Sequence, residues 1–216
     1  MDEERAVKIV VFGATGRIGG KLVSGGIARG HEVTAAARHP ERIPPRHHAP
    51  RLVTCDLLDA AQVESAVARQ DAAMVAVGAR FALLPGAVHS EGVANVLRAM
   101  RARAVRRVIC ITAIGTGAGD DADLPPLFTG LFRPLFLGPV WEELRAMEDQ
   151  VRSSGLEWTL VHAGRLTSGP ALGRYRVEEG AGMPGARKIS RADIADFMLK
   201  ELERGEWVGR DVTVAY

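Results

Sequence analysis

The sequence predicts an α/β fold, a doubly wound parallel sheet in a single domain that covers residues 1–216. Short apolar runs alternate with segments of helical apolar spacing along most of the chain. Apolar residues make up 47% of the chain and aromatic residues only 5%. The core must therefore consist mainly of Ala, Val, Leu and Ile, as expected for parallel strands covered by helices. The length suits one domain, and no domain boundary or internal repeat is evident.

Six strands are expected to alternate with helices. Each expected strand is a short apolar run, and each expected helix carries apolar residues three or four positions apart. The strands are expected at 7–12, 31–37, 52–54, 72–77, 108–112 and 158–161. Helices are expected from Ile18 to near Gly30, after a cap at Asp59, at 88–101 and at 141–153, and residues 163–216 form a C-terminal extension.

A glycine-rich loop follows the first expected strand. Gly13, Gly16 and Gly19 stand between a buried apolar run and a helix. In such loops the first glycine allows a sharp turn, the second lets a pyrophosphate approach the backbone, and the third lets the helix pack closely. The helix N-terminus adds free N–H groups and the positive end of its dipole. A Rossmann-type dinucleotide site is predicted here, with contacts from Gly13, Thr15, Gly16, Arg17, Ile18 and Gly19.

The end of the second expected strand indicates which dinucleotide is bound. Arg38 follows Ala37, and no carboxylate occurs nearby until Glu41. A carboxylate at this point would bind the ribose hydroxyls of NAD, whereas an arginine can bind the 2′-phosphate of NADP. The cofactor is therefore predicted to be NADP(H), with Arg17 and Arg42 as candidate helpers.

Further cofactor contacts are expected where the later strands end, because these ends meet at one edge of the sheet. Asp56 can meet the adenine amino group, or it can cap the following turn. Arg80 can reach the diphosphate after the fourth strand. The other expected contacts are Leu57, Gly78, Ala79, Thr112, Ala163 and Gly164.

Several stretches resemble the atypical short-chain dehydrogenase/reductases. They include GATGRIG at 13–19, Arg38 and CDLLD at 55–59, together with the absence of Tyr-x-x-x-Lys. The resemblance runs nearly end to end and is closest to the biliverdin-IXβ reductase, or NADPH-dependent flavin reductase, group, with further likeness to NmrA-like proteins. In ISRADIADFMLKEL at 189–202 it implies a long C-terminal helix.

The resemblance implies an NADPH site and a redox role, and it suggests residues beside the nicotinamide. In the reductase group, a serine near the end of the fifth strand and a histidine after the sixth face the nicotinamide. Thr112 and Arg165 stand at the matching positions. Thr112 keeps a hydroxyl, whereas an arginine cannot donate a proton near neutral pH but can hold an anionic or carbonyl-bearing substrate. His162, expected just after the sixth strand, is the other acid–base candidate, and Glu148 is expected to be structural or to anchor a loop.

The absent Tyr-Lys pair indicates the class of acceptor. The chain has two tyrosines, and Glu179 stands four residues after Tyr175. A ketone needs a proton as its alkoxide forms, whereas reduced flavins and quinones spread their charge and can take protons from water. We expect a reductase that transfers hydride to a conjugated planar acceptor: a flavin, a quinone or a polycyclic aromatic ketone. Two alternatives stay open, an NmrA-like NADP(H) sensor without turnover and an isomerase or dehydratase that uses the cofactor structurally.

The segment 117–139 is rich in both apolar residues and prolines and follows the fifth expected strand, on the substrate side. It can serve as a lid over a flat substrate, as a subunit contact, or as core beneath a loop. These three interpretations stay open.

Composition argues against several other classes. A formal net charge of +2, and a basic run at 98–107 without aromatic residues, do not favour nucleic-acid binding. No apolar run reaches the roughly 18 residues of a membrane span, and the N-terminus lacks an apolar signal region. A cytoplasmic monomer or homodimer without membrane contact is expected. Cys55 and Cys110 are expected to be buried free thiols, and no metal site is predicted.

Overall fold

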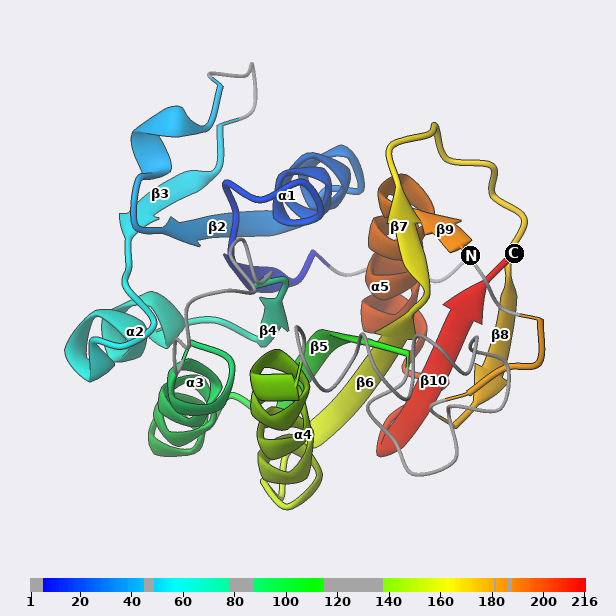
Figure 1. The fold of residues 1–216 in the computed structure, drawn as a ribbon. Helices are drawn as coiled ribbons and strands as arrows, with labels where there is room; N and C mark the ends of the chain where they lie inside the picture. Colours follow the sequence, from blue (N-terminus) through cyan, green and yellow to red (C-terminus); the bar gives the residue numbers. More distant parts are fainter. Residues whose placement is uncertain (1–5, 45–48, 78–87, 115–137, 181, 186–187) are drawn as a thin grey trace.

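A computed structural model describes residues 6–44, 49–77, 88–114, 138–180, 182–185 and 188–216 (Figure 1). The strands of its large sheet are β1 (Lys8–Phe12), β2 (Glu32–Ala37), β3 (Arg51–Thr54), β4 (Ala72–Val75), β5 (Arg107–Ala113), β6 (Glu157–Ala163), β8 (Arg176–Glu179) and β10 (Arg210–Ala215). Two short strands form a second sheet, β7 (Arg165–Thr167) and β9 (Lys188–Ser190). The helices are α1 (Gly19–Ala28), α2 (Ala60–Val67), α3 (Ser90–Ala102), α4 (Gly138–Arg152) and α5 (Arg191–Arg204), with a short 3-10 turn at Pro40–Arg42.

The large sheet has eight strands in the order β3-β2-β1-β4-β5-β6-β10-β8. Every neighbouring pair is parallel except β10 and β8, which run antiparallel. The order reverses direction between β1 and β4, and folds of this kind bind ligands outside the carboxyl ends of the strands at such a point. The predicted doubly wound α/β fold is therefore confirmed, with one antiparallel strand at its edge.

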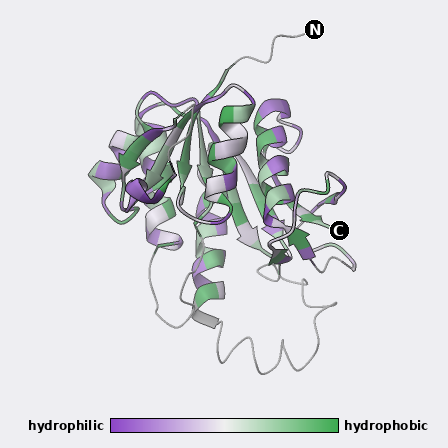
Figure 2. Ribbon diagram, turned by 90° about the horizontal axis from the view of Figure 1, so that it is seen from above, coloured by the Kyte–Doolittle hydropathy of each residue, from purple (hydrophilic) through white to green (hydrophobic). Residues whose placement is uncertain are grey.

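Helices cover both faces of this sheet, and the two faces have separate cores (Figures 1 and 2). Successive strand residues point to opposite faces, so Ile9 and Val11 pack beneath α1 and α5 while Val10 and Phe12 pack beneath α2, α3 and α4. All four side chains are buried. This two-sided burial explains why the central strands read as continuous apolar runs.

The six strands expected from the sequence are present, with ends that differ by one or two residues. Asp59 caps α2 as expected, because its carboxylate accepts from the N–H groups of Ala61 and Gln62. The four strands of the C-terminal extension were not anticipated. The apolar run of β10 is broken by Asp211 and Thr213, which hides its strand character although it pairs with β6 along its length.

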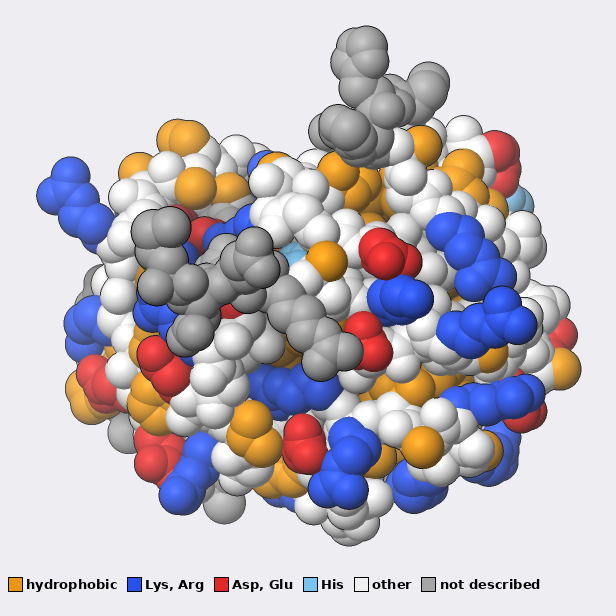
Figure 3. Space-filling view, turned by 180° about the vertical axis from the view of Figure 1, so that it is seen from behind, with side chains coloured by type: hydrophobic (Ala, Val, Ile, Leu, Met, Phe, Trp, Pro, Cys, Tyr) orange, Lys and Arg blue, Asp and Glu red, His pale blue; other side chains and the backbone are white. Residues whose placement is uncertain are grey.

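Charged side chains of both signs are mixed on the face that Figure 3 shows. On the face in Figure 3, Lys and Arg side chains lie among acidic and apolar ones. None of the described helices combines the length and the apolar character needed to cross a bilayer.

A buried ion pair joins α5 to the amino-terminal end of the sheet. The Arg107 guanidinium lies 2.6 Å from the Glu201 carboxylate, whose side chain is 1% exposed. Glu201 also accepts from the Thr159 hydroxyl and the Trp207 N–H. Burial lowers the pKa of Arg107, and the Glu201 charge acts against that effect. This pair lies at the edge opposite the glycine loop, so it bears on stability rather than on ligand binding.

We expect Glu201→Ala to lower the free energy of unfolding by about 3–5 kcal/mol, because it leaves the buried Arg107 charge uncompensated. Urea denaturation measures the loss. The matched control is Glu206→Ala, which removes an exposed pair with Arg204 at 3.7 Å and should cost less than about 1 kcal/mol. Similar losses in the two variants would mean that the buried Arg107–Glu201 pair contributes no more to the free energy of unfolding than an exposed pair does.

Candidate functional site

The glycine loop turns sharply where β1 ends and lies against the end of β4. Gly13 has a φ of +78°, a backbone conformation that side chains disfavour. A Cβ on Gly13 would lie 2.5 Å from the Ala76 carbonyl oxygen, and one on Gly19 would lie 2.1 Å from the Gly13 carbonyl oxygen. The Gly16 N–H donates to that same Gly13 oxygen at 2.8 Å. The loop is therefore too tight for side chains at its first and last glycines.

The N-terminus of α1 is open to a ligand. Ile18 precedes the helix and gives no side-chain cap, and the first turn holds no acidic residue. Thr15, Gly16 and Arg17 are exposed beside it, while Ile18 is buried in the core. The Gly20 and Lys21 N–H groups donate to the Gly16 and Ile18 carbonyl oxygens, so the helix dipole is what favours an anion at this position. The loop and helix thus fit the pyrophosphate of a dinucleotide.

The neighbouring strands bring other predicted contacts to the same edge. Arg38 is exposed directly after β2, and the Ala14 N–H donates to the Ala36 carbonyl, which joins the loop to the end of β2. Asp56 follows β3, where one carboxylate oxygen accepts from the Leu58 N–H at 3.1 Å. Asp56 therefore caps a local turn, and its contact with adenine stays a prediction. Leu57 beside it is buried. The predicted contacts Gly78, Ala79 and Arg80 lie outside the described residues.

Thr112 lies near the carboxyl end of β5, and its hydroxyl points to α4. This hydroxyl donates to the Glu148 carboxylate at 2.6 Å, and both side chains are buried. The other Glu148 oxygen accepts from Arg152, one helical turn further along α4, at 3.1 Å. The buried Glu148 carboxylate thus joins a predicted site residue to the half-buried Arg152 guanidinium.

His162 lies beside Thr112 in the sheet, in register with it. The expectation that His162 follows the sixth strand is wrong, because β6 continues to Ala163 and the His162 side chain is fully buried. Its Nε2 lies 2.9 Å from the Asp211 carboxylate and its Nδ1 lies 3.3 Å from the Ala113 carbonyl oxygen. The ring therefore makes its hydrogen bonds inside the protein.

Asp211 completes this group on β10. It accepts from His162 and, at 2.7 Å, from Arg152. Burial alone would raise the pKa of Asp211, but the hydrogen bonds from His162 and Arg152 outweigh burial and lower the pKa to about 2. We call this set the Thr112 network; its members are Thr112, Glu148, Arg152, His162 and Asp211. Sequence reasoning missed Arg152 and Asp211, and the i,i+4 spacing of Glu148 and Arg152 was the one available signal.

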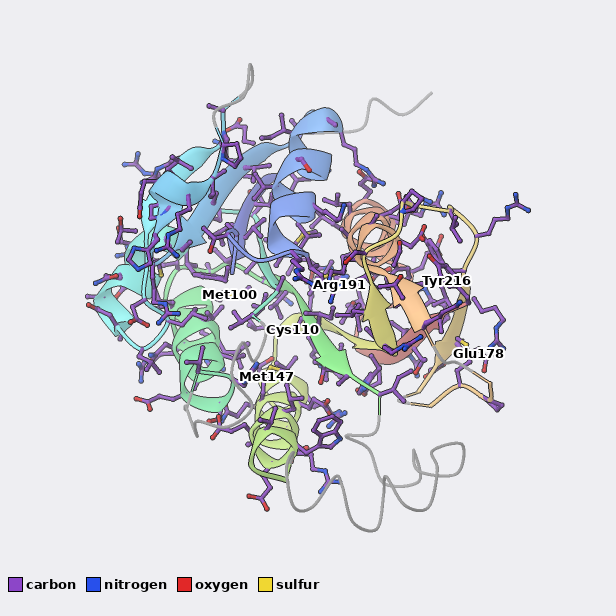
Figure 4. All side chains as sticks on the ribbon, turned by 45° about the horizontal axis from the view of Figure 1, so that its top comes forward. Met100, Cys110, Met147, Glu178, Arg191 and Tyr216 are labelled. Atoms are coloured by element: carbon purple, nitrogen blue, oxygen red, sulfur yellow. The ribbon has the colours of Figure 1, made fainter. Side chains whose placement is uncertain are left out.

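The sixth strand leads directly into β7 at the carboxyl edge of the sheet. Ala163 is buried and Gly164 half-buried, and Arg165 on β7 is exposed, in register with the exposed Lys188 of β9. Arg191, at the start of α5, donates to the Ser168 hydroxyl. In Figure 4, Arg191 lies toward β7 and the middle of the molecule. Basic side chains thus border this part of the edge.

Both tyrosines are engaged by carboxylates. The Tyr175 hydroxyl donates to Asp196 at 3.0 Å, and the Tyr216 hydroxyl donates to Asp193 at 2.5 Å. Burial and then the hydrogen bond to Asp196 raise the pKa of Tyr175. This environment opposes the lowered pKa that a catalytic tyrosine needs.

The cysteines play no visible part in this site. Cys55 and Cys110 are buried free thiols, as predicted, and burial raises the pKa of each to about 12. Cys110 lies in the core near Met100 of α3 and Met147 of α4 (Figure 4). Within the described part of the chain, no cluster of three or more His, Cys, Asp or Glu residues could hold a metal ion.

Comparisons with known proteins agree with the dinucleotide site. The model of the NAD(P)H-binding family matches residues 13–204. A 3-diazoavenalumate denitrifying reductase from Streptomyces sp. is 32% identical over 186 residues, which are 79% of this chain and 59% of that protein. An uncharacterized chloroplastic protein from Arabidopsis thaliana is 27% identical over 189 residues, which are 82% of this chain and 66% of that protein. The chain spans less than two thirds of the length of either relative.

The fold is shared with solved structures as well. A short-chain dehydrogenase/reductase from Veillonella parvula, solved in complex with NADP, superimposes with a TM-score of 0.81 and 18% identity. The match covers 96% of this chain and 94% of that one.

We expect Gly13→Ala to weaken NADPH binding at least about tenfold, because the loop must move away from Ala76 to admit a Cβ. Titration calorimetry measures the affinity. Gly30→Ala is the matched control, since Gly30 also has a positive φ but no atom lies within 4 Å of its Cβ position. Gly30→Ala should cost stability, about 1–2 kcal/mol, and leave the affinity unchanged. Equal losses of affinity would argue against a ligand site in the loop.

We expect Asp211→Asn to lower the free energy of unfolding by about 1–3 kcal/mol at neutral pH, because charged hydrogen bonds from His162 and Arg152 are lost. The folded-state pKa of Asp211 is depressed from 3.8 to about 2. Its contribution is therefore present above about pH 4 and is lost as the pH falls through about 2. Denaturation curves measured across this range should show a steeper decline for the wild type than for Asp211→Asn. The exposed Glu206→Gln serves as control, and an Asp211→Asn curve parallel to the wild type would refute the assignment.

Proposed function

Because the chain belongs to the NAD(P)H-binding family, we propose that it is an NADPH-dependent reductase that transfers hydride to a conjugated planar acceptor. One combination of observations carries this proposal. The glycine loop leaves the N-terminus of α1 without a side-chain cap, and both tyrosine hydroxyls donate to carboxylates, so neither is set up as a proton donor to a substrate. Such a site can orient a nicotinamide while leaving the acceptor to take its proton from water.

Arg38 supports NADPH over NADH. Its guanidinium is exposed directly after β2, where the ribose of a dinucleotide on the glycine loop would lie. An arginine there can bind the 2′-phosphate with a fork of two hydrogen bonds. Arg17, exposed in the loop itself, is a candidate helper.

NADPH, when bound, supplies the hydride. The chain's own part is to hold the diphosphate with the glycine loop and the α1 N-terminus, to present the Thr112 end of β5 to the nicotinamide, and to exclude water. On the substrate side, the exposed Arg165 can hold an anionic or carbonyl-bearing acceptor. His162 is proposed to support Thr112 from inside the protein, since its ring is buried against Asp211.

The acceptor class follows from the proton requirement. Flavins, quinones and polycyclic aromatic ketones spread the added charge over a conjugated system. An aryl diazonium ion accepts hydride with loss of dinitrogen and needs no proton, and the Streptomyces relative carries the name of a denitrifying reductase of a diazo compound. An aryl diazonium therefore belongs in the same acceptor panel.

The test is NADPH oxidation, followed by absorbance, with FMN, a quinone, a polycyclic aromatic ketone and an aryl diazonium. We expect turnover with at least one acceptor, and a slower rate in Arg165→Ala if that acceptor carries an anionic or carbonyl group. Tight cofactor binding without turnover against the whole panel would instead favour an NmrA-like sensor. No binding of either dinucleotide would overturn the proposal.

We expect Arg38→Ala to weaken NADPH binding about ten- to a hundredfold and to spare NADH, because a charged hydrogen bond is worth about 1.5–3 kcal/mol. Fluorescence titration with both cofactors measures the difference. Arg204→Ala is the control, since Arg204 ends α5 and is exposed beside Glu206. Equal losses of affinity for NADPH and NADH in Arg38→Ala would contradict the assignment of NADP as the cofactor.

A further inference from the structure

The Thr112 network restricts what the Thr112 hydroxyl can do. A hydroxyl has one proton to donate, and the Thr112 proton is directed to Glu148 at 2.6 Å. Charged hydrogen bonds of this kind are short and strong. The hydroxyl oxygen keeps lone pairs that can accept. Toward a ligand, Thr112 is therefore an acceptor and not a donor.

Glu148 is held in a single arrangement by the rest of the network. Its first oxygen accepts from Thr112 and its second from Arg152. Arg152 in turn donates to both oxygens of Asp211, at 3.1 and 2.7 Å. The hydrogen bond to Asp211 raises the pKa of Arg152, so this side chain stays charged. Since a guanidinium only donates, the Glu148 oxygen that faces it must accept.

We propose that Glu148 is a positioning residue that fixes Thr112 as a hydrogen-bond acceptor, so that Thr112 recognises an N–H group on a bound ring. This inference rests on the proposed function, because it requires a nicotinamide or its acceptor at the end of β5. The N–H group has two sources, the carboxamide of the nicotinamide and the imide of a flavin acceptor. Thr112 selects and orients the ring, and the proton of the reaction does not come from its hydroxyl.

The substitution Glu148→Gln inverts the arrangement with almost no change of shape. The glutamine has one oxygen, and the donor-only Arg152 requires it. The amide N–H group then faces Thr112, whose hydroxyl must accept from it and turn its own proton toward the ligand. Thr112→Val removes the hydroxyl at constant shape, and Thr112→Ser retains it.

The first experiment compares the affinity for NADP⁺ with that for its 3-acetylpyridine analogue, which replaces the carboxamide NH₂ by a methyl group. We expect the wild type and Thr112→Ser to prefer NADP⁺ by about two- to tenfold, the worth of one hydrogen bond. Glu148→Gln and Thr112→Val should lose that preference. Glu142→Gln, the same chemical change on α4 at an exposed side chain, should keep it. Circular dichroism identifies any variant that does not fold, and Thr112→Val then carries the test.

The second experiment compares FMN with N3-methyl FMN as acceptor in the same variants. If only this discrimination disappears in Glu148→Gln, the recognised N–H is the flavin imide; if only the dinucleotide preference disappears, it is the carboxamide. If neither changes in Glu148→Gln and Thr112→Val, the inference is overturned. Cofactor preference without turnover would leave the inference standing and refute the reductase. Turnover with both discriminations unchanged in the variants would support the reductase and overturn the inference about Thr112. A chain that binds no dinucleotide would overturn the reductase proposal and the inference together.

Discussion

The contact between the glycine loop and the end of β4 constrains the rest of the candidate site. Because the Gly13 turn lies against the Ala76 carbonyl, the chain leaves β1 in one direction only and enters α1 with its N–H groups facing the carboxyl edge. That direction then determines where α1 packs. Gly25 and Gly26 of α1 face Leu199 of α5 so closely that a Cβ on Gly25 would lie 2.7 Å from it. The backbone path at Gly13 therefore determines both the geometry of the glycine loop and the packing of α1 against α5.

Sequence patterns were sufficient for the fold and the loop because both depend on neighbours in the chain. The glycines at 13, 16 and 19 are readable since each relieves a clash within a few residues or with the next strand. Strand ends such as Arg38 and Asp56 followed from the rule that parallel strands end at one edge. The apolar runs of β1, β2, β4, β5 and β6 were equally clear, because two-sided burial leaves few polar interruptions.

The Thr112 network could not be predicted from the sequence, because its members are brought together by the fold and not by neighbouring positions in the chain. Its members come from β5, α4, β6 and β10, which lie far apart in the sequence and meet only through the sheet order β5-β6-β10. Asp211 and His162 even obscured the strands that carry them, since polar residues in an apolar run suggest a strand end. These polar residues pair with one another across neighbouring elements, and the pairing can be recognised only when the topology is known.

The same network has a mechanical consequence. Charged hydrogen bonds tie α4 to β5 and to β10, and removal of a partner would leave the buried Glu148 carboxylate without a compensating charge or hydrogen bond. Sliding of α4 along the sheet would break several of these bonds at once. These bonds therefore hold α4, β5 and β10 together, whereas the two-stranded sheet of β7 and β9 has no member in the network. A ligand that requires a change of shape at this edge would therefore displace β7 and β9 more readily than α4.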